Sequence, residues 1–140
     1  MTARFATTAG DSGAKSSDYA SGRCNIGPAE VARRRLVGHA AALATLGALV
    51  MLPVLDAPTW TRLLLFFPAA GAAAGYLQAA LRFCADYGWR GVFNFGRAGH
   101  DRTITVVDAD ARRADRRMAL FIGMASAAIG ALVALVALLA

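Results

Sequence analysis

Three long stretches of the chain contain no Asp, Glu, Lys or Arg. They cover 36–55, 63–81 and 118–140, which are 20, 19 and 23 residues long. An α-helix rises about 1.5 Å per residue, so each stretch can cross a hydrocarbon layer about 30 Å thick. The pattern predicts an all-α membrane protein with three transmembrane helices. Extended to the nearest turn formers, the expected helices cover about 28–53, 59–83 and 108–140.

Local signals indicate where the helices begin. Pro28 suits the first position of a helix, where its missing N–H removes no hydrogen bond, and Glu30 would sit in the favourable first turn. Asp108 is a good N-cap for the last helix. The short connection 56–60, which contains Pro58, predicts that the first two helices form an antiparallel hairpin.

Polar composition divides the rest of the chain. Residues 1–23 are mainly Ala, Ser, Thr and Gly with scattered charges, which is typical of a disordered tail. Residues 24–140 are expected to form a single three-helix domain with one sizeable loop, 84–107. The aromatic residues of 87–96 look interfacial. Residues 103–107 have strand character but no evident partner strand.

Composition excludes several classes of protein. The chain is 57% hydrophobic and only 17% charged, whereas soluble domains average about 45–50% apolar and about 25% charged residues. A soluble enzyme, a secreted disulfide scaffold and a wholly disordered chain are therefore disfavoured. The net charge of +6 comes from 14 Arg and one Lys against nine acids. In a soluble protein this charge would raise the question of nucleic-acid binding.

The position of the basic residues is more informative than their number. Of the 15, 14 lie in 1–35 or 82–117, and only Arg62 lies in the turn between the first two helices. By the positive-inside rule, the N-terminus and loop 84–107 are expected in the cytoplasm. The first turn and the C-terminus are then expected outside. Because topology accounts for the arginines, no nucleic-acid partner is expected.

Small residues mark the expected helix-packing faces. Gly71 and Gly75 form a GxxxG pattern in the second span, and the third span contains Gly123, Ser126 and Gly130. Such positions let helix backbones approach closely. We expect the faces of the second and third helices to pair with each other, or to dock a partner helix.

Two thiols are the main candidates for chemistry. Cys24 and Cys84 are both expected on the reducing cytoplasmic side, where a structural disulfide is disfavoured. They are either inert small side chains or a thiol pair that carries sulfur, binds a metal or responds to oxidants. His39 and His100 are weak additional metal candidates, and structural or loop roles are the alternative. No cofactor-binding motif is recognised.

A cluster of arginines precedes the third apolar stretch. It consists of Arg112, Arg113, Arg116 and Arg117. The simplest interpretation is that these residues determine topology. The alternative is a site for anionic lipid headgroups, because several basic residues beside a span attract acidic lipids.

One run of residues resembles a known family. Cys24-Asn25-Ile26-Gly27, Glu30, Arg33/Arg34 and Gly38 precede the first span, and Phe83-Cys84-Ala85-Asp86-Tyr87-Gly88 follows the second. This pattern, over 24–88, is similar to the YgaP-like inner-membrane domain, a helical hairpin often associated with rhodanese domains. That family typically has proline where this chain has Ala85, and it lacks the third helix. The resemblance implies a sulfur-related role for Cys84, with any sulfur transferase being a separate partner.

Three functions follow as hypotheses. The first is a non-catalytic accessory or scaffold subunit of a complex in the bacterial cytoplasmic (inner) membrane, in contact with lipids and with a membrane-protein partner or a second copy. The second is a sulfur, metal or redox relay that uses Cys24 and Cys84. The third is a membrane protein that binds anionic lipid.

Overall fold

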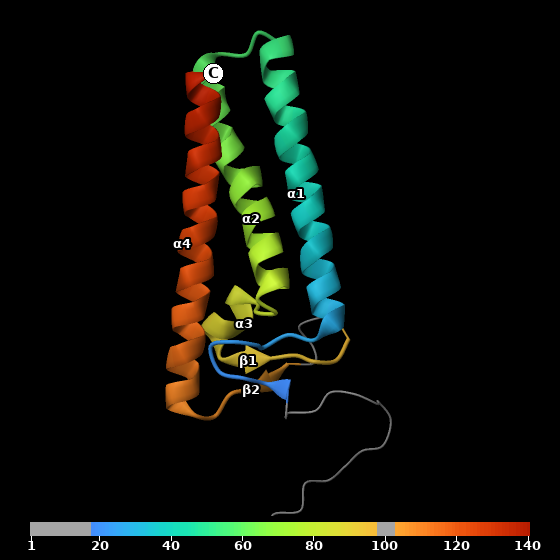
Figure 1. Ribbon diagram of the computed structural model, residues 1–140, viewed down its shortest axis with the longest axis vertical. Helices are drawn as coiled ribbons and strands as arrows, with labels where there is room; N and C mark the ends of the chain where they lie inside the picture. The colour runs from blue at the N-terminus through green and yellow to red at the C-terminus, as the bar shows by residue number, and fades with distance from the viewer. Residues whose placement is uncertain (1–17, 98–102) are drawn as a thin grey trace, which may run out of the picture.

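The computed structural model describes residues 18–97 and 103–140. Its long elements are helix α1 (Pro28–Val54), the 3-10 helix η2 (Thr59–Leu65) with its continuation α2 (Phe66–Ala80), and helix α4 (Ala109–Leu139). Among the described residues, three helical segments are long and apolar enough to cross a membrane, which confirms the three expected spans. The α2 helix lies between α1 and α4 and packs against both (Figure 1).

The ends of the helices follow the local sequence signals. Pro28 is the first residue of α1 and Glu30 lies in its first turn. The side chain of Asp108 accepts a hydrogen bond of 2.7 Å from the backbone N–H of Ala111, so it caps α4 as expected. The second span differs from the prediction, since its first seven residues form a 3-10 helix and α2 ends at Ala80.

The expected loop 84–107 contains regular structure. It holds the short helix α3 (Ala85–Arg90) and the strands β1 (Val92–Phe93) and β2 (Ile104–Thr105). The strands are antiparallel, with Val92 opposite Thr105 and Phe93 opposite Ile104. The expectation that 103–107 has no partner strand was therefore wrong. The partner was missed because two-residue strands carry too little periodicity to be recognised.

The segment before α1 belongs to the same folded unit. Ile26 forms a β-bridge with Asn94, Ala20 forms one with Cys24, and the ring of Tyr19 stacks on Phe93 with 4.8 Å between centroids. Residues 18–27, α3, β1 and β2 together form a layer at one end of the helices, here named the polar cap (Figure 1). Residues 18–23 are thus folded rather than part of a disordered tail, and the rest of that expected tail lies outside the described residues.

The small residues pack differently from the prediction. A Cβ added to Gly75 would lie 2.7 Å from the Cα of Gly38, so the second helix uses its GxxxG face against α1. Gly130 of α4 instead approaches the start of α2, where an added Cβ would lie 2.7 Å from the carbonyl oxygen of Phe66. The expected pairing of the two small-residue faces with each other was wrong. A glycine face fits any helix that offers a small partner, and Gly38 supplies one.

The aromatic residues of 87–96 were expected at lipid headgroup depth, and most are not exposed. Tyr87 is fully buried and Phe93 is 7% exposed, whereas Trp89 remains 56% exposed. Tyr87 packs with Ile26, Cys84 and Val92 in a small core inside the polar cap. Alternation of glycines with rings is common to interfacial segments and to tight turns around a core, so the pattern alone did not separate them.

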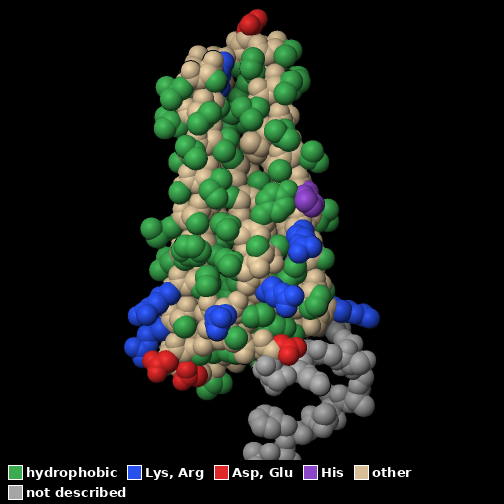
Figure 2. All heavy atoms as spheres, in the orientation of Figure 1, with side chains coloured by type: hydrophobic (Ala, Val, Ile, Leu, Met, Phe, Trp, Pro, Cys, Tyr) green, Lys and Arg blue, Asp and Glu red, His purple; other side chains and the backbone are tan. Residues whose placement is uncertain are grey.

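The sides of the bundle are apolar and one end is charged. Leu43 and Val54 of α1 and Met124 of α4 are each about 70% exposed. Figure 2 shows apolar side chains along the length of the molecule and most arginines and acids gathered at the polar cap. A surface this apolar is stable in hydrocarbon and would aggregate in water. The distribution therefore supports a membrane protein.

Candidate functional site

The polar cap is built around a buried carboxylate, that of Glu30, whose residue is 0% exposed. The hydroxyl of Tyr87 donates a hydrogen bond of 3.2 Å to Glu30 Oε1. Arg33 and Arg34, one turn further along α1, lie 3.6 and 3.8 Å from the carboxylate oxygens. The i,i+3 and i,i+4 spacing places both arginines beside Glu30 on one helix face, and because the carboxylate is buried, its removal would leave a desolvated charge on Arg34.

Arg34 links this carboxylate to Cys84. Its Nη2 donates to the Sγ of Cys84 at 2.9 Å. Burial raises the pKa of the Cys84 thiol, and this effect exceeds the opposing effects of Arg34 and of the backbone N–H groups of Tyr87 and Asp86. The protonated thiol therefore predominates at neutral pH. Burial also raises the pKa of Tyr87, so its hydroxyl remains a donor to Glu30.

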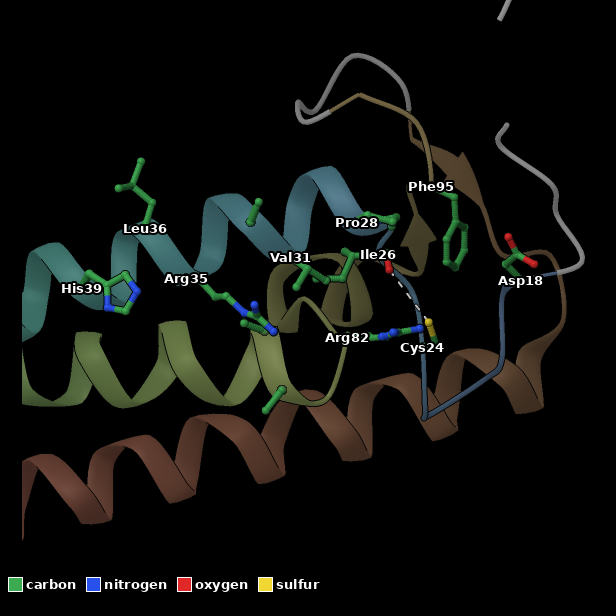
Figure 3. A pocket seen from close by; sticks show the side chains of 14 residues that line it. Asp18, Cys24, Ile26, Pro28, Val31, Arg35, Leu36, His39, Arg82 and Phe95 are labelled. Carbon is green, nitrogen blue, oxygen red and sulfur yellow. Dashed lines mark hydrogen bonds between the residues drawn. The ribbon is translucent and has the colours of Figure 1, made fainter. Parts of the chain in front are cut away.

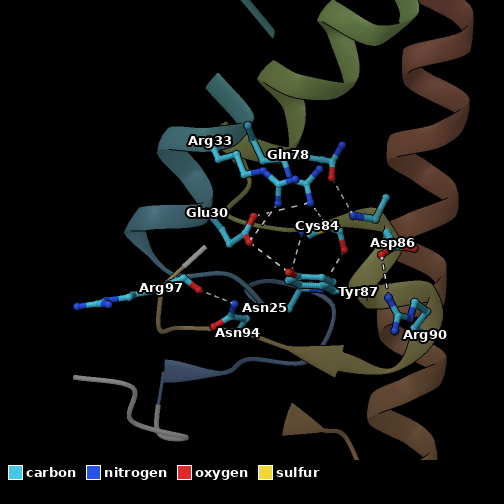
Figure 4. A network of polar contacts seen from close by, with 12 residues as sticks. Asn25, Glu30, Arg33, Gln78, Cys84, Asp86, Tyr87, Arg90, Asn94 and Arg97 are labelled. Atoms are coloured by element: carbon cyan, nitrogen blue, oxygen red, sulfur yellow. Dashed lines mark hydrogen bonds and ion pairs between the residues drawn. The ribbon is translucent and has the colours of Figure 1, made fainter. Parts of the chain in front are cut away.

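Asn25 joins the segment before α1 to the loop after α2. Its Nδ2 donates to the carbonyl of Cys84 at 3.1 Å, and the N–H of Cys84 donates to its Oδ1 at 2.7 Å (Figure 4). The backbone N–H groups of Asn25 and Ile26 both donate to the carbonyl of Arg82, at 3.2 and 3.3 Å. One asparagine therefore ties together two segments that are distant in sequence.

Asn94 plays the matching role on the strand side. Its backbone pairs with that of Asn25 and Gly27, at 2.9 and 2.8 Å, and its Oδ1 accepts from the N–H of Gly96 at 2.8 Å. Gly27 is required at this contact, because an added Cβ would lie 2.8 Å from the carbonyl oxygen of Phe95. The polar groups of the two asparagines serve the backbone, which rigidifies the polar cap.

The two cysteines lie in the same cap but in different surroundings. Cys84 is fully buried beside Arg34, whereas Cys24 is half-buried and lines a cleft together with Arg35 and Arg82 (Figure 3). The Sγ of Cys24 contacts the carbonyl oxygen of Ile26 at 3.9 Å. Both thiols are free. The chain thus gathers the two cysteines at one end of the molecule, while each thiol has its own partners.

We expect the two thiols to react at different rates. In the folded protein at pH 7.5, Cys84 should be alkylated by iodoacetamide about tenfold more slowly than Cys24, or slower still, because it is buried and its raised pKa lowers the thiolate fraction. The alkylation rate of Cys84 should still be rising at pH values above the ordinary pKa of a thiol, because its own pKa is raised. Mass spectrometry after quenching measures both sites, with detergent-unfolded protein as the control. Equal rates in the folded state would contradict the burial of Cys84.

The other metal candidates do not join the cysteines. Nδ1 of His39 hydrogen-bonds to the hydroxyl of Tyr76 at 2.7 Å, which links α1 to α2. His100 lies outside the described residues. Within 18–97 and 103–140, no group of three or more His, Cys, Asp or Glu side chains is arranged to hold a metal ion.

The arginines of the α4 cluster have different surroundings. The stem of Arg112 covers Gly91, Arg113 pairs with Asp110 at 2.7 Å, and Arg116 and Arg117 are exposed. The acid within this cluster was not predicted from the sequence. Asp115 is fully buried and accepts 2.7 Å hydrogen bonds from the hydroxyl of Tyr19 and the N–H of Gly22. A single acid among four arginines is the signal that would have singled it out.

The residues that suggested a family resemblance converge in the structure. Asn25, Glu30, Arg34 and Cys84 form one network, and Gly38 lies one turn further along α1 against Gly75. Comparisons of the chain with protein-family models, with curated proteins and with solved structures found no match. The YgaP-like resemblance therefore remains a prediction. The burial of the Cys84 thiol argues against the sulfur-related role that this resemblance implies.

Proposed function

We propose that this chain is a non-catalytic accessory or scaffold subunit of a complex in the bacterial cytoplasmic membrane. The positive-inside rule supports an orientation with the polar cap in the cytoplasm and the C-terminus outside, because all but one of the basic residues lie in 1–35 and 82–117. The network around Glu30 supports a structural role for the cap. Its asparagines, arginines and buried acids bond to the chain itself, which leaves a rigid platform beneath the helices.

One helix face carries the proposal. Gly75 and Gly130 are occupied by the chain's own helices, but an added Cβ at Gly123 would meet nothing within 4 Å. Ala127 and Ala131 follow Gly123 at intervals of four residues, and both are exposed. Small residues at this spacing allow close approach of another helix. The docking face of α4 is therefore Gly123, Ala127 and Ala131, rather than the two buried glycine contacts.

Replacing Gly123 with Leu tests this face. We expect Gly123→Leu to weaken association with the partner, or with a second copy, by about tenfold or more, because a large side chain keeps the helix backbones apart. The folded monomer should be unaffected, since the position opens outward. Fluorescence energy transfer between labelled copies in vesicles measures self-association, and quantitative mass spectrometry after mild-detergent purification measures a partner.

The chain offers a matched control in Gly47, a glycine of α1 that likewise has nothing within 4 Å of an added Cβ. Gly47→Leu makes the same substitution on a different helix, and it should leave association intact. If both variants lose association equally, or if neither does, α4 does not present the docking face.

The thiol relay is the alternative function, but only one of its two thiols, that of Cys24, is accessible. Cys24 is half-buried at a cleft, but Cys84 is enclosed by Ile26, Tyr87 and Val92. A relay through both thiols would require the polar cap to open at Cys84. Fast alkylation of Cys84 in the folded protein would favour the relay over the scaffold role.

A further inference from the structure

A cleft of about 960 Å³ opens where the polar cap meets the apolar helices (Figure 3). One wall is the first part of α1, including Val31, Arg35 and Leu36. The end of α2 and the loop that follows it supply the facing wall, with Ala80 and Arg82. The segment around Cys24 and the ring of Phe95 also line the cleft. Its lining thus combines charged side chains with apolar ones on both walls.

The cleft carries two guanidinium groups from different elements. Arg33 and Arg34 are paired with Glu30, but neither Arg35 nor Arg82 forms an ion pair with any acid of the described residues. Asp18 is the acidic residue of the lining. The other titratable residues of the lining are Cys24 and His39, and the ring of His39 is already hydrogen-bonded to the hydroxyl of Tyr76. The lining therefore favours an anion.

Arg82 is held in place by its backbone. Its φ of +50° lies in the left-handed region, which residues other than glycine rarely adopt unless the surroundings maintain it. Two backbone N–H groups, those of Asn25 and Ile26, bind its carbonyl oxygen, and the side chain of Asn25 clamps the neighbouring Cys84. The fold thus maintains an uncommon backbone conformation at Arg82, whose positively charged side chain lines the cleft.

The position of the cleft along α1 matches the depth of lipid headgroups. Arg35 is the last charged residue before 36–55, so polar and apolar lining meet within one turn of helix. An arginine there can extend its stem along apolar surface and keep its charge at the interface. Guanidinium groups bind phosphate oxygens through paired hydrogen bonds. A phosphate group attached to an acyl chain matches this combination of arginines and apolar side chains.

We propose that this cleft binds the headgroup of an anionic phospholipid, with Arg35 and Arg82 contacting its phosphate and the Leu36–Ala80 side receiving the start of an acyl chain. The proposal rests on the membrane location and is independent of the docking face of α4. It places lipid recognition between α1 and α2, rather than at the arginine cluster of α4, where Arg112 covers Gly91 and Arg113 is paired with Asp110.

Native mass spectrometry of the full chain in detergent tests the proposal, by titration with phosphatidylglycerol or with zwitterionic phosphatidylcholine. The intact chain should prefer phosphatidylglycerol. Loss of one basic residue near a headgroup weakens binding by about fivefold, so the double variant R35Q/R82Q should bind phosphatidylglycerol about 25-fold more weakly. R35K/R82K, which keeps both charges, should retain most of the affinity.

The matched control is R116Q/R117Q, which removes the same two charges from exposed positions of α4 that do not line the cleft. It should leave the affinity unchanged. An equal loss in both double variants would show diffuse attraction and overturn the proposal, as would equal binding of the two lipids by the intact chain. If an equal concentration of inorganic phosphate displaces the lipid, the cleft binds free phosphate and not a lipid headgroup, and the proposal is overturned.

Circular dichroism checks that each variant is folded. If R35Q/R82Q unfolds, R35Q alone, at an exposed position, must show the fivefold loss.

Discussion

Replacing Gly75 with Ala is expected to lower the free energy of unfolding by about 2 kcal/mol, within the range for overpacked cores. The new Cβ would lie 2.7 Å from both the Cα and the N of Gly38, and 2.9 Å from the carbonyl oxygen of Arg34. These are backbone atoms, which cannot rotate away, so α1 and α2 must separate along their crossing. This loss outweighs the gain of about 1 kcal/mol that Ala brings over Gly in a helix. Unfolding by sodium dodecyl sulfate in mixed micelles measures the change.

Gly71, one turn earlier in α2, provides the matched control. A Cβ at Gly71 would contact only the Cβ of Ala41, at an ordinary 3.7 Å. Gly71→Ala should therefore retain or raise stability, by up to about 1 kcal/mol from helix propensity. The two glycines of the same GxxxG pattern are expected to respond in opposite directions. Equal effects of the two substitutions would contradict the close crossing at Gly38.

Replacing Glu30 with Gln is the second change with a large expected effect, a loss of about 3 kcal/mol in the free energy of unfolding. Gln has the size of Glu but no charge, so the partly buried Arg34, whose side chain is 18% exposed, loses its counter-ion. The hydroxyl of Tyr87 also loses a charged acceptor. Removing one member of a buried ion pair costs much more than the pair contributes, because the remaining charge stays desolvated. Thermal unfolding in detergent, followed by circular dichroism, measures the loss.

Asp110→Asn is the control for Glu30→Gln. Asp110 makes the shorter ion pair, 2.7 Å to Arg113, but the two side chains are 85% and 70% exposed. Water screens an exposed pair, so this change should cost no more than about 0.5 kcal/mol. If the two substitutions cost the same, burial does not determine the strength of these pairs, and the network around Glu30 is not the support of the polar cap.

The spans were predictable because hydrocarbon imposes a strong local rule. A helix that crosses it must be about 20 residues long and free of charge, and 36–55, 63–81 and 118–140 satisfy that rule by composition alone. Helix starts were equally local. Pro28 and Asp108 act on backbone groups within one turn, so their positions could be identified without knowledge of the fold.

The polar cap was the part that local reasoning could not assemble. Its strands are two residues long, and Val92 and Phe93 find their partners more than ten residues away. Asn25 and Cys84 are separated by 59 positions, yet they exchange two hydrogen bonds. A polar residue outside the spans looks the same in sequence whether it faces water or a buried backbone group. Asn25 and Asn94 therefore carried no signal of their role.

The sequence by itself determined that the chain has three helices long and apolar enough to cross a membrane, where they begin, and that its basic residues gather at one end, because charge and hydropathy act residue by residue. Only the tertiary structure decided which glycine meets which helix and which thiol is enclosed. It also brought Arg35 and Arg82 to one cleft while Arg33 and Arg34 are paired with Glu30. These outcomes depend on contacts between distant segments. Identical residue types can therefore become either structural supports or open sites.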